Sequence, residues 1–85
     1  MSSYNPVLQA AIYELIDNQL RDGTPLETRQ TLERLISEGH TPQEARRLIA
    51  CAVVSEILDI LQRHEPYDEA HYTAALRRLP TMPWE

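Results

Sequence analysis

Three pairs of a capping residue followed by proline divide this chain more sharply than any other feature of its sequence. They are Asn5-Pro6, Thr24-Pro25 and Thr41-Pro42. Proline at the first position of a helix sacrifices no hydrogen bond, because that N–H has no partner within the helix. In the second and third pairs a glutamate follows the threonine after three residues, Glu27 and Glu44. This spacing predicts a capping box, so each pair marks the start of a helix.

The helix ends are marked as clearly as the starts. Gly23 and Gly39 stand where a left-handed residue ends the preceding helix. Pro66 stops a third helix, and Asp68 is a suitable N-cap for a fourth. Together these signals predict helices over residues 6–21, 25–38, 42–64 and 68–79.

Apolar residues recur in all four segments at spacings of three and four, and no segment alternates with a period of two. Short connections between such helices favour antiparallel neighbours. We therefore expect an all-α fold: a small up-and-down bundle of four helices around a long central third helix. The 85 residues form a single helical domain, residues 1–85. Its last part, residues 80–85, is expected to be an extended C-terminal tail, because two prolines favour extended backbone.

Composition excludes several classes of function. The chain carries 8 basic and 13 acidic residues, a net charge of −5, which disfavours binding to nucleic acid. No apolar run is long enough to cross a membrane, and the N-terminus does not resemble a signal peptide, so no membrane association is expected. Cys51, the single cysteine, lies in an apolar stretch and is expected to be a structural core residue. One cysteine forms no internal disulfide and suits a reducing, cytoplasmic location.

The histidines are the first candidates for chemistry. His64 and His71 flank the turn between the third and fourth helices, near the acidic residues Glu65, Asp68 and Glu69. A zinc site there lacks a third neutral ligand at a fixed spacing. The alternative is a charged helix end, with His64 near the C-terminus of its helix, where cations are favoured. We expect no metal, no cofactor and no catalytic residue.

A second candidate is a polar group shared by the first and third helices, called here the remnant polar site. Its members are Gln9, Tyr13, Asp17, Gln43, Glu44 and Arg47. One interpretation is a solvated face with a weak ion pair between Glu44 and Arg47. The other is a hydrogen-bonded network in which Arg47 contacts Glu44 or Asp17 near Tyr13.

The chain also resembles a small bacterial helical family of unknown function. The residues that carry the resemblance are Asn5-Pro6-Val7-Leu8, Gln19, Pro25, Arg34-Leu35, Gly39, Glu44-Ala45, and Tyr72 with Leu76. The family pattern is NPxxHxxxHxxxExQ followed by HEAxH, which has the spacing of zinc or iron ligands. Here Gln9, Tyr13, Gln43 and Arg47 stand in place of the four histidines, and Asp17 stands in place of the glutamate. The resemblance therefore implies a degenerate member of a metal-binding family that retains a polar network, because a guanidinium repels a metal ion.

The third helix suggests a different function, since its middle is apolar on every side. A second apolar stripe, called here the outer stripe, consists of Ala50, Val54, Leu58 and Leu61. A symmetric copy of the chain would cover this stripe, whereas a monomer would need three short helices to wrap the third one completely. Trp84 either seals one end of the bundle or anchors a partner at the rim. We expect a non-enzymatic protein-interaction module, a homodimer, with an unidentified protein as a further partner.

Overall fold

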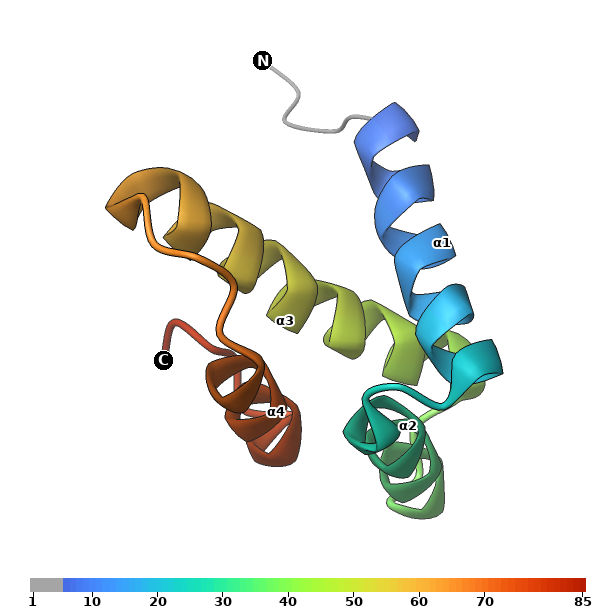
Figure 1. Ribbon diagram of the computed structural model, residues 1–85. Helices are drawn as coiled ribbons and strands as arrows, with labels where there is room; N and C mark the ends of the chain where they lie inside the picture. The colour runs from blue at the N-terminus through green and yellow to red at the C-terminus, as the bar shows by residue number, and fades with distance from the viewer. Residues whose placement is uncertain (1–5) are drawn as a thin grey trace.

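The computed structural model describes residues 6–85, which contain four helices and no strand. The helices are α1 (Pro6–Asp22), α2 (Leu26–Ser37), α3 (Pro42–Arg63) and α4 (Glu69–Arg78). Figure 1 shows α3, the longest at 22 residues, running through the middle of the molecule. The predicted all-α bundle around a long third helix is confirmed, and no helix boundary differs from its prediction by more than a single residue. The predicted cap at Asn5 lies outside the described residues.

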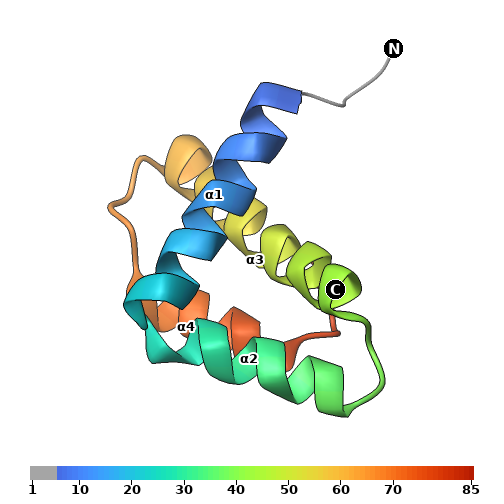
Figure 2. The same ribbon diagram turned by 90° about the vertical axis from the view of Figure 1, so that its right-hand side faces the viewer.

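The helices are not all aligned along one axis. In Figure 1, α1 and α3 lie across the view, while α2 and α4 are seen nearly end-on. The turned view in Figure 2 shows α1 crossing α3, with α2 and α4 running beside each other. Each of α1, α2 and α4 packs on α3, but α1 and α4 do not pack on each other.

A single hydrophobic core forms where the other helices meet α3. From α3 it takes Ala45, Ile49, Ala52 and Val53, whose spacing of three and four puts them on one face. The rest of the core consists of Ile12, Ile16, Leu35, Tyr72, Ala75 and Leu76 from the other helices, and Leu79 just after α4. The two alanines on α3 let neighbouring backbones approach closely, so the larger side chains of the other helices fill the remaining space.

The start of α3 is the predicted capping box. The Thr41 hydroxyl accepts from the Glu44 N–H at 3.1 Å, and the Glu44 carboxylate accepts from the Thr41 N–H at 2.8 Å. Asp68 caps α4 as predicted, accepting from the His71 N–H at 3.3 Å. Gly23 and Gly39 have φ of 70° and 107°, the left-handed region that glycine adopts at little cost.

The second predicted capping box is wrong. Helix α2 begins one residue later, with Pro25 at the N-cap and no side chain capping it. Glu27 does not reach back to Thr24; its carboxylate accepts from Arg77 of α4 at 3.1 Å instead. The Thr28 N–H donates to the carbonyl of the buried Pro25. This backbone hydrogen bond forms the first turn of α2, so the Thr24 side chain is not needed as a cap. A long-range ion pair has replaced the expected local hydrogen bond.

The C-terminal tail is also not extended. Residues 79–85 form turns, in which the Thr81 N–H donates to Arg78 and the Glu85 N–H donates to Met82. The Glu85 carboxylate accepts from the Met82 N–H at 2.8 Å, which holds the last turn closed. Met82 packs against the core, while Trp84 is 66% exposed. Trp84 therefore does not seal the end of the bundle, and Met82 makes that contact instead. The role of Trp84 as an anchor for a partner stays a prediction.

Replacing Thr41 with alanine should lower the free energy of unfolding by about 0.5–2 kcal/mol, because the N3 amide loses its acceptor. Urea denaturation followed by circular dichroism measures this loss. The matched control is Thr24→Ala, which removes a threonine that caps nothing and should change stability by less than about 0.5 kcal/mol. Equal losses for the two variants would contradict the assignment of the caps.

Candidate functional site

A pocket lies between α1, α3 and the segment that leads into α4. Its volume is about 520 Å³, within the usual range for small-molecule sites. We call it the α1–α3 pocket. Its residues are Leu15, Asn18, Gln19, Asp22, Thr24, Pro25, Val53, Glu56, Ile57, Ile60, Tyr67, Glu69 and Tyr72. Space remains there because α1 and α4 both pack on α3 without packing on each other.

Gln19 forms the polar wall of this pocket and links three helices. Its side-chain oxygen accepts from the Thr28 hydroxyl of α2 at 2.8 Å and from the Tyr72 hydroxyl of α4 at 3.0 Å. Thr28 and Tyr72 are almost completely buried, so these hydroxyls depend on Gln19 for an acceptor. The sequence shows Gln19 only as a polar residue on α1, and its role arises from the packing.

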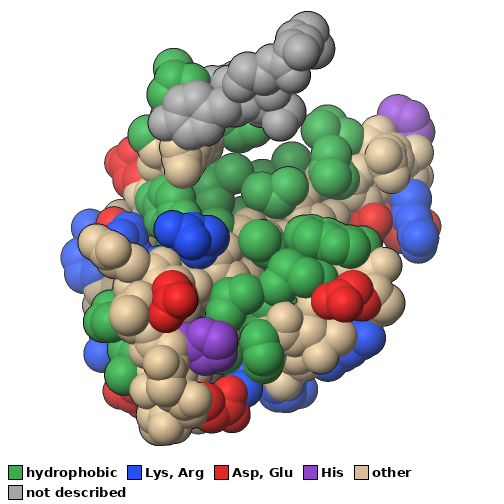
Figure 3. All heavy atoms as spheres, turned by 180° about the vertical axis from the view of Figure 1, so that it is seen from behind, with side chains coloured by type: hydrophobic (Ala, Val, Ile, Leu, Met, Phe, Trp, Pro, Cys, Tyr) green, Lys and Arg blue, Asp and Glu red, His purple; other side chains and the backbone are tan. Residues whose placement is uncertain are grey.

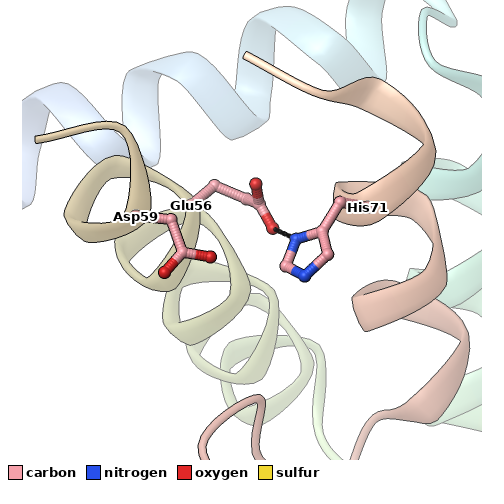
Figure 4. Close-up of side chains that lie close together, drawn as sticks. All are labelled: Glu56, Asp59 and His71. Atoms are coloured by element: carbon pink, nitrogen blue, oxygen red, sulfur yellow. Dashed lines mark hydrogen bonds and ion pairs between the residues drawn. The ribbon is translucent and has the colours of Figure 1, made fainter. Parts of the chain in front are cut away.

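A cluster of ionisable side chains lies on the other side of Glu56. The Glu56 carboxylate is 7% exposed and accepts from Nδ1 of His71 across the α3–α4 junction, as Figure 4 shows. One ligand atom from each of Glu56, Asp59 and His71 lies within 4.8 Å of the others. Such a group offers two carboxylates and one imidazole to a divalent cation.

The electrostatics of this cluster favour an ion pair. The hydrogen bond to Glu56, and then the Glu56 charge, raise the pKa of His71. A protonated imidazole donates from both nitrogens and offers no lone pair to a metal. Of the residues predicted around a conceivable zinc site, Asp68 is used as the α4 cap and His64 ends α3 with φ of 57°. The structure thus joins His71 to Glu56, a residue that the sequence analysis did not consider.

The remnant polar site is only partly brought together. Asp17 is paired, but with Arg46: one guanidinium nitrogen lies 2.9 and 3.0 Å from the two carboxylate oxygens. The same guanidinium stacks over the Tyr13 ring, 4.9 Å from its centroid. The predicted partner of Asp17, Arg47, is wrong, because Arg46 is the residue that α3 turns towards α1. A guanidinium over an aromatic ring and beside a carboxylate is a stabilising arrangement.

The other members of the remnant polar site stay apart. Gln9, Gln43 and Arg47 are exposed. Glu44 is engaged in the capping box, where the bonds from Thr41 lower its pKa. The charge of Arg47 lowers the same pKa more weakly. The interaction expected between Glu44 and Arg47 is thus a weak charge effect. The prediction that Cys51 is a core residue is wrong: its side chain is half-buried and outside the core cluster, and partial burial raises the pKa of its thiol.

The outer stripe of α3 is exposed to an uneven degree. Ala50 and Val54 are half-buried and pack against the core, whereas Leu58 and Leu61 are 47% and 63% exposed. Figure 3, which views the molecule from behind, shows a broad band of hydrophobic side chains on that face. None of the four residues of the outer stripe lines the α1–α3 pocket. Helix α3 therefore presents two separate apolar surfaces beyond the core.

Substituting Gln19 with leucine should destabilise the fold, because two buried hydroxyls lose their acceptor. Each loss costs about 1–3 kcal/mol, measurable by thermal or urea unfolding. Adding Tyr72→Phe to Gln19→Leu should regain part of the loss, since one stranded hydroxyl is then removed. A cost below about 0.5 kcal/mol for Gln19→Leu would show that water replaces the glutamine.

The raised pKa of His71 predicts a pH-dependent contribution to stability. The pair with Glu56 stabilises the fold fully below the pKa of histidine in an unfolded chain, about 6.5. The stabilisation is lost as the pH rises through the higher pKa of the folded protein. His71→Gln should therefore lower the free energy of unfolding more near pH 6 than near pH 9. The loss near pH 6 should be about 0.5–1 kcal/mol, a small value because solvent screens the half-exposed ring.

A double-mutant cycle provides the control for His71. In the background of Glu56→Gln, the substitution His71→Gln should have the same effect at both pH values. Urea unfolding at each pH measures the four proteins. A pH dependence that survives in the Glu56→Gln background would assign it to another titrating group.

Comparisons with protein-family models, with curated proteins and with solved structures found no match to this chain. The resemblance to a small bacterial helical family therefore stays a prediction. None of the helices in residues 6–85 combines the length and the apolar character needed to cross a membrane. Inferences about function depend on the surfaces described above.

Proposed function

We propose that this protein is a non-enzymatic, cytoplasmic protein-interaction module that self-associates through the outer stripe of α3. The observation that carries the proposal is the pair of exposed leucines, Leu58 and Leu61, on a helix whose opposite face already forms the core. Complete burial of a leucine contributes about 1.5–3 kcal/mol, so covering the exposed half of each contributes about 1 kcal/mol.

The shape of the outer stripe favours a second copy of the chain as the partner. A small residue, Ala50, occupies its N-terminal part beside Cys51, and leucines occupy its C-terminal part. When two α3 helices cross in antiparallel fashion about Val54, Ala50 of one copy faces Leu58 of the other. Large side chains then meet small ones twice, as the symmetry of an isologous dimer requires.

The rim of the stripe is compatible with this packing. Arg47 precedes Ala50 by three residues, is exposed, and has no ion-pair partner within the described part of the chain. Glu65 follows Leu61 beyond the end of α3 and is exposed as well. The same antiparallel crossing brings Arg47 of one copy towards the C-terminal end of the other α3, where Glu65 lies. Opposite charges at the rim favour this alignment over a parallel one.

The second candidate function is a degenerate metal-binding protein with a polar network at the former site. The observation that favours it is the contact of Arg46 with Asp17 and Tyr13. That network holds a permanent cation beside the carboxylate, which is opposed to metal binding. It supports retention of a polar contact, and it adds no chemistry of its own.

Glutamate at Leu58 and Leu61 together should dissociate the dimer and leave the helices intact. Both leucines lose their apolar contact with the partner, and the carboxylate at position 58 is desolvated against Ala50 of the other copy, while exposed positions tolerate the change in the monomer. Sedimentation equilibrium measures the mass, and circular dichroism checks the fold. These positions test the surface more directly than Val54→Glu, since Val54 also packs against the core.

Leu26→Glu is the matched control for the leucine variants. Leu26 is 55% exposed on α2, far along the chain from the outer stripe, and glutamate suits the first turn of a helix. This variant should keep the mass of the wild-type protein. A wild-type protein that stays monomeric at about 0.5 mM would contradict the proposal. Its free energy of dimerisation would then be weaker than about −4 kcal/mol.

A further inference from the structure

The charge of the α1–α3 pocket sets it apart from an ordinary gap between helices. Three acidic residues line it, and each comes from a different helix: Asp22 from α1, Glu56 from α3 and Glu69 from α4. No arginine or histidine is among the lining residues. A concave, largely apolar surface with carboxylates on three sides has a negative potential that its low-dielectric walls strengthen.

Basic neighbours reduce this charge without cancelling it. Arg21 contacts Asp22 at 3.1 Å, and both side chains are well exposed, so solvent screens the pair. His71 holds one oxygen of Glu56 from the side away from the pocket lining. Glu69 has no ion-pair partner in residues 6–85.

The walls between the carboxylates suit an apolar body. Leu15, Val53, Ile57 and Ile60 provide aliphatic surface from α1 and α3. Tyr67 and Tyr72 add two aromatic rings, with centroids 6.2 Å apart and a tilt of 54°. Aromatic faces attract cations, and Tyr67 is half exposed to this space, whereas Tyr72 is buried.

Tyr67 gives a second indication of the negative potential. Burial, and after it the charge of Glu69, raise the pKa of Tyr67 to about 12. Glu56 and Asp68 shift the pKa in the same direction, which means that all of these charges oppose a further negative charge at the ring. The part of the shift that comes from these carboxylates favours a cation at the same position, whereas burial disfavours a charge of either sign.

We infer that the α1–α3 pocket binds a small organic cation: an ammonium group attached to an apolar, preferably aromatic, body. The ammonium lies among the three carboxylates and the Tyr67 ring, and the apolar body lies against the aliphatic side chains of α1 and α3. The amide of Asn18 lines the same space and supplies a further oxygen acceptor for the N–H groups. This site is separate from the proposed dimer surface, because the outer stripe contributes none of its lining.

Three probes of matched shape and different charge test this inference: phenylbutylamine, phenylbutanol and phenylbutyrate. Titration of the ¹⁵N-labelled protein followed by NMR reports both the affinity and the position of each probe. The amine should bind about tenfold more tightly than the alcohol, since one favourable charge interaction in a partly buried site is worth about that factor. The carboxylate should bind more weakly than the alcohol, and shifts should concentrate at amides that line the pocket.

A pair of double variants separates the pocket from the overall charge of the protein. Asp22→Asn with Glu69→Gln removes two exposed carboxylates from the pocket and leaves the buried Glu56 paired with His71. Glu14→Gln with Glu33→Gln removes the same charge from exposed positions outside it. The first variant should reduce the preference for the amine over the alcohol several-fold, and the second should preserve it.

Several outcomes would overturn the inference. One is equal affinity for the amine and the alcohol; another is equal loss of the preference in both double variants. Absence of shifts at the pocket amides with all three probes would overturn it as well. A failure of the dimer proposal is distinguishable, because the leucine variants Leu58→Glu and Leu61→Glu should bind the amine as the wild-type protein does.

Discussion

Burial of one face of α3 is the constraint on which the rest of this structure depends. Ala45, Ile49, Ala52 and Val53 form that face, and each of the three shorter helices contributes large side chains to it. A chain of this size buries a limited fraction of its surface, so a single long helix shared by all the others is an economical way to make one core. Since α1, α2 and α4 all pack on the same helix, their positions relative to one another follow largely from where each of them meets it.

Polar contacts decide how the shorter helices are oriented on that core. Gln19 joins α1 to α2 and α4 through Thr28 and Tyr72, and Arg34 of α2 donates to the Leu76 carbonyl of α4 at 3.2 Å. Arg46 ties the start of α3 to α1 through Asp17. These bonds are directional, whereas apolar packing is not, so they select one arrangement among several that would bury similar area.

The two candidate surfaces are consequences of the same geometry. The outer stripe remains because three short helices do not cover every side of a long one. The α1–α3 pocket remains because α1 and α4 both pack on α3 while their backbones stay apart, and the Gln19–Tyr72 hydrogen bond joins them. The buried Glu56 carboxylate forms an ion pair with His71 and also lines the α1–α3 pocket. Its charge therefore has a partner on one side and contributes to the pocket on the other. Both surfaces are on α3, and they are formed by different rows of its side chains.

Local signals in the sequence determined the helices, because caps and breakers act on neighbouring residues. Thr41 with Glu44, Asp68, and the left-handed glycines Gly23 and Gly39 behave as their spacing predicts. The exposed leucines of α3 were also predictable from periodicity, since a helix turns by a fixed angle per residue.

Only the tertiary structure decided which distant groups meet. Glu27 pairs with Arg77 and not with the predicted Thr24. Arg46, and not the predicted Arg47, contacts Asp17. Glu56 pairs with His71, a contact that the sequence does not predict. The spacing of Glu56 from Ala52 and Val53 indicates from sequence that it lies on the buried face of α3. The sequence does not indicate that His71 is its partner. A small rotation of one helix on another changes which long side chain reaches a given carboxylate, and that rotation is set by packing of the whole core. The α1–α3 pocket likewise has no signature in the sequence, because it exists only in the space between helices that the core holds apart.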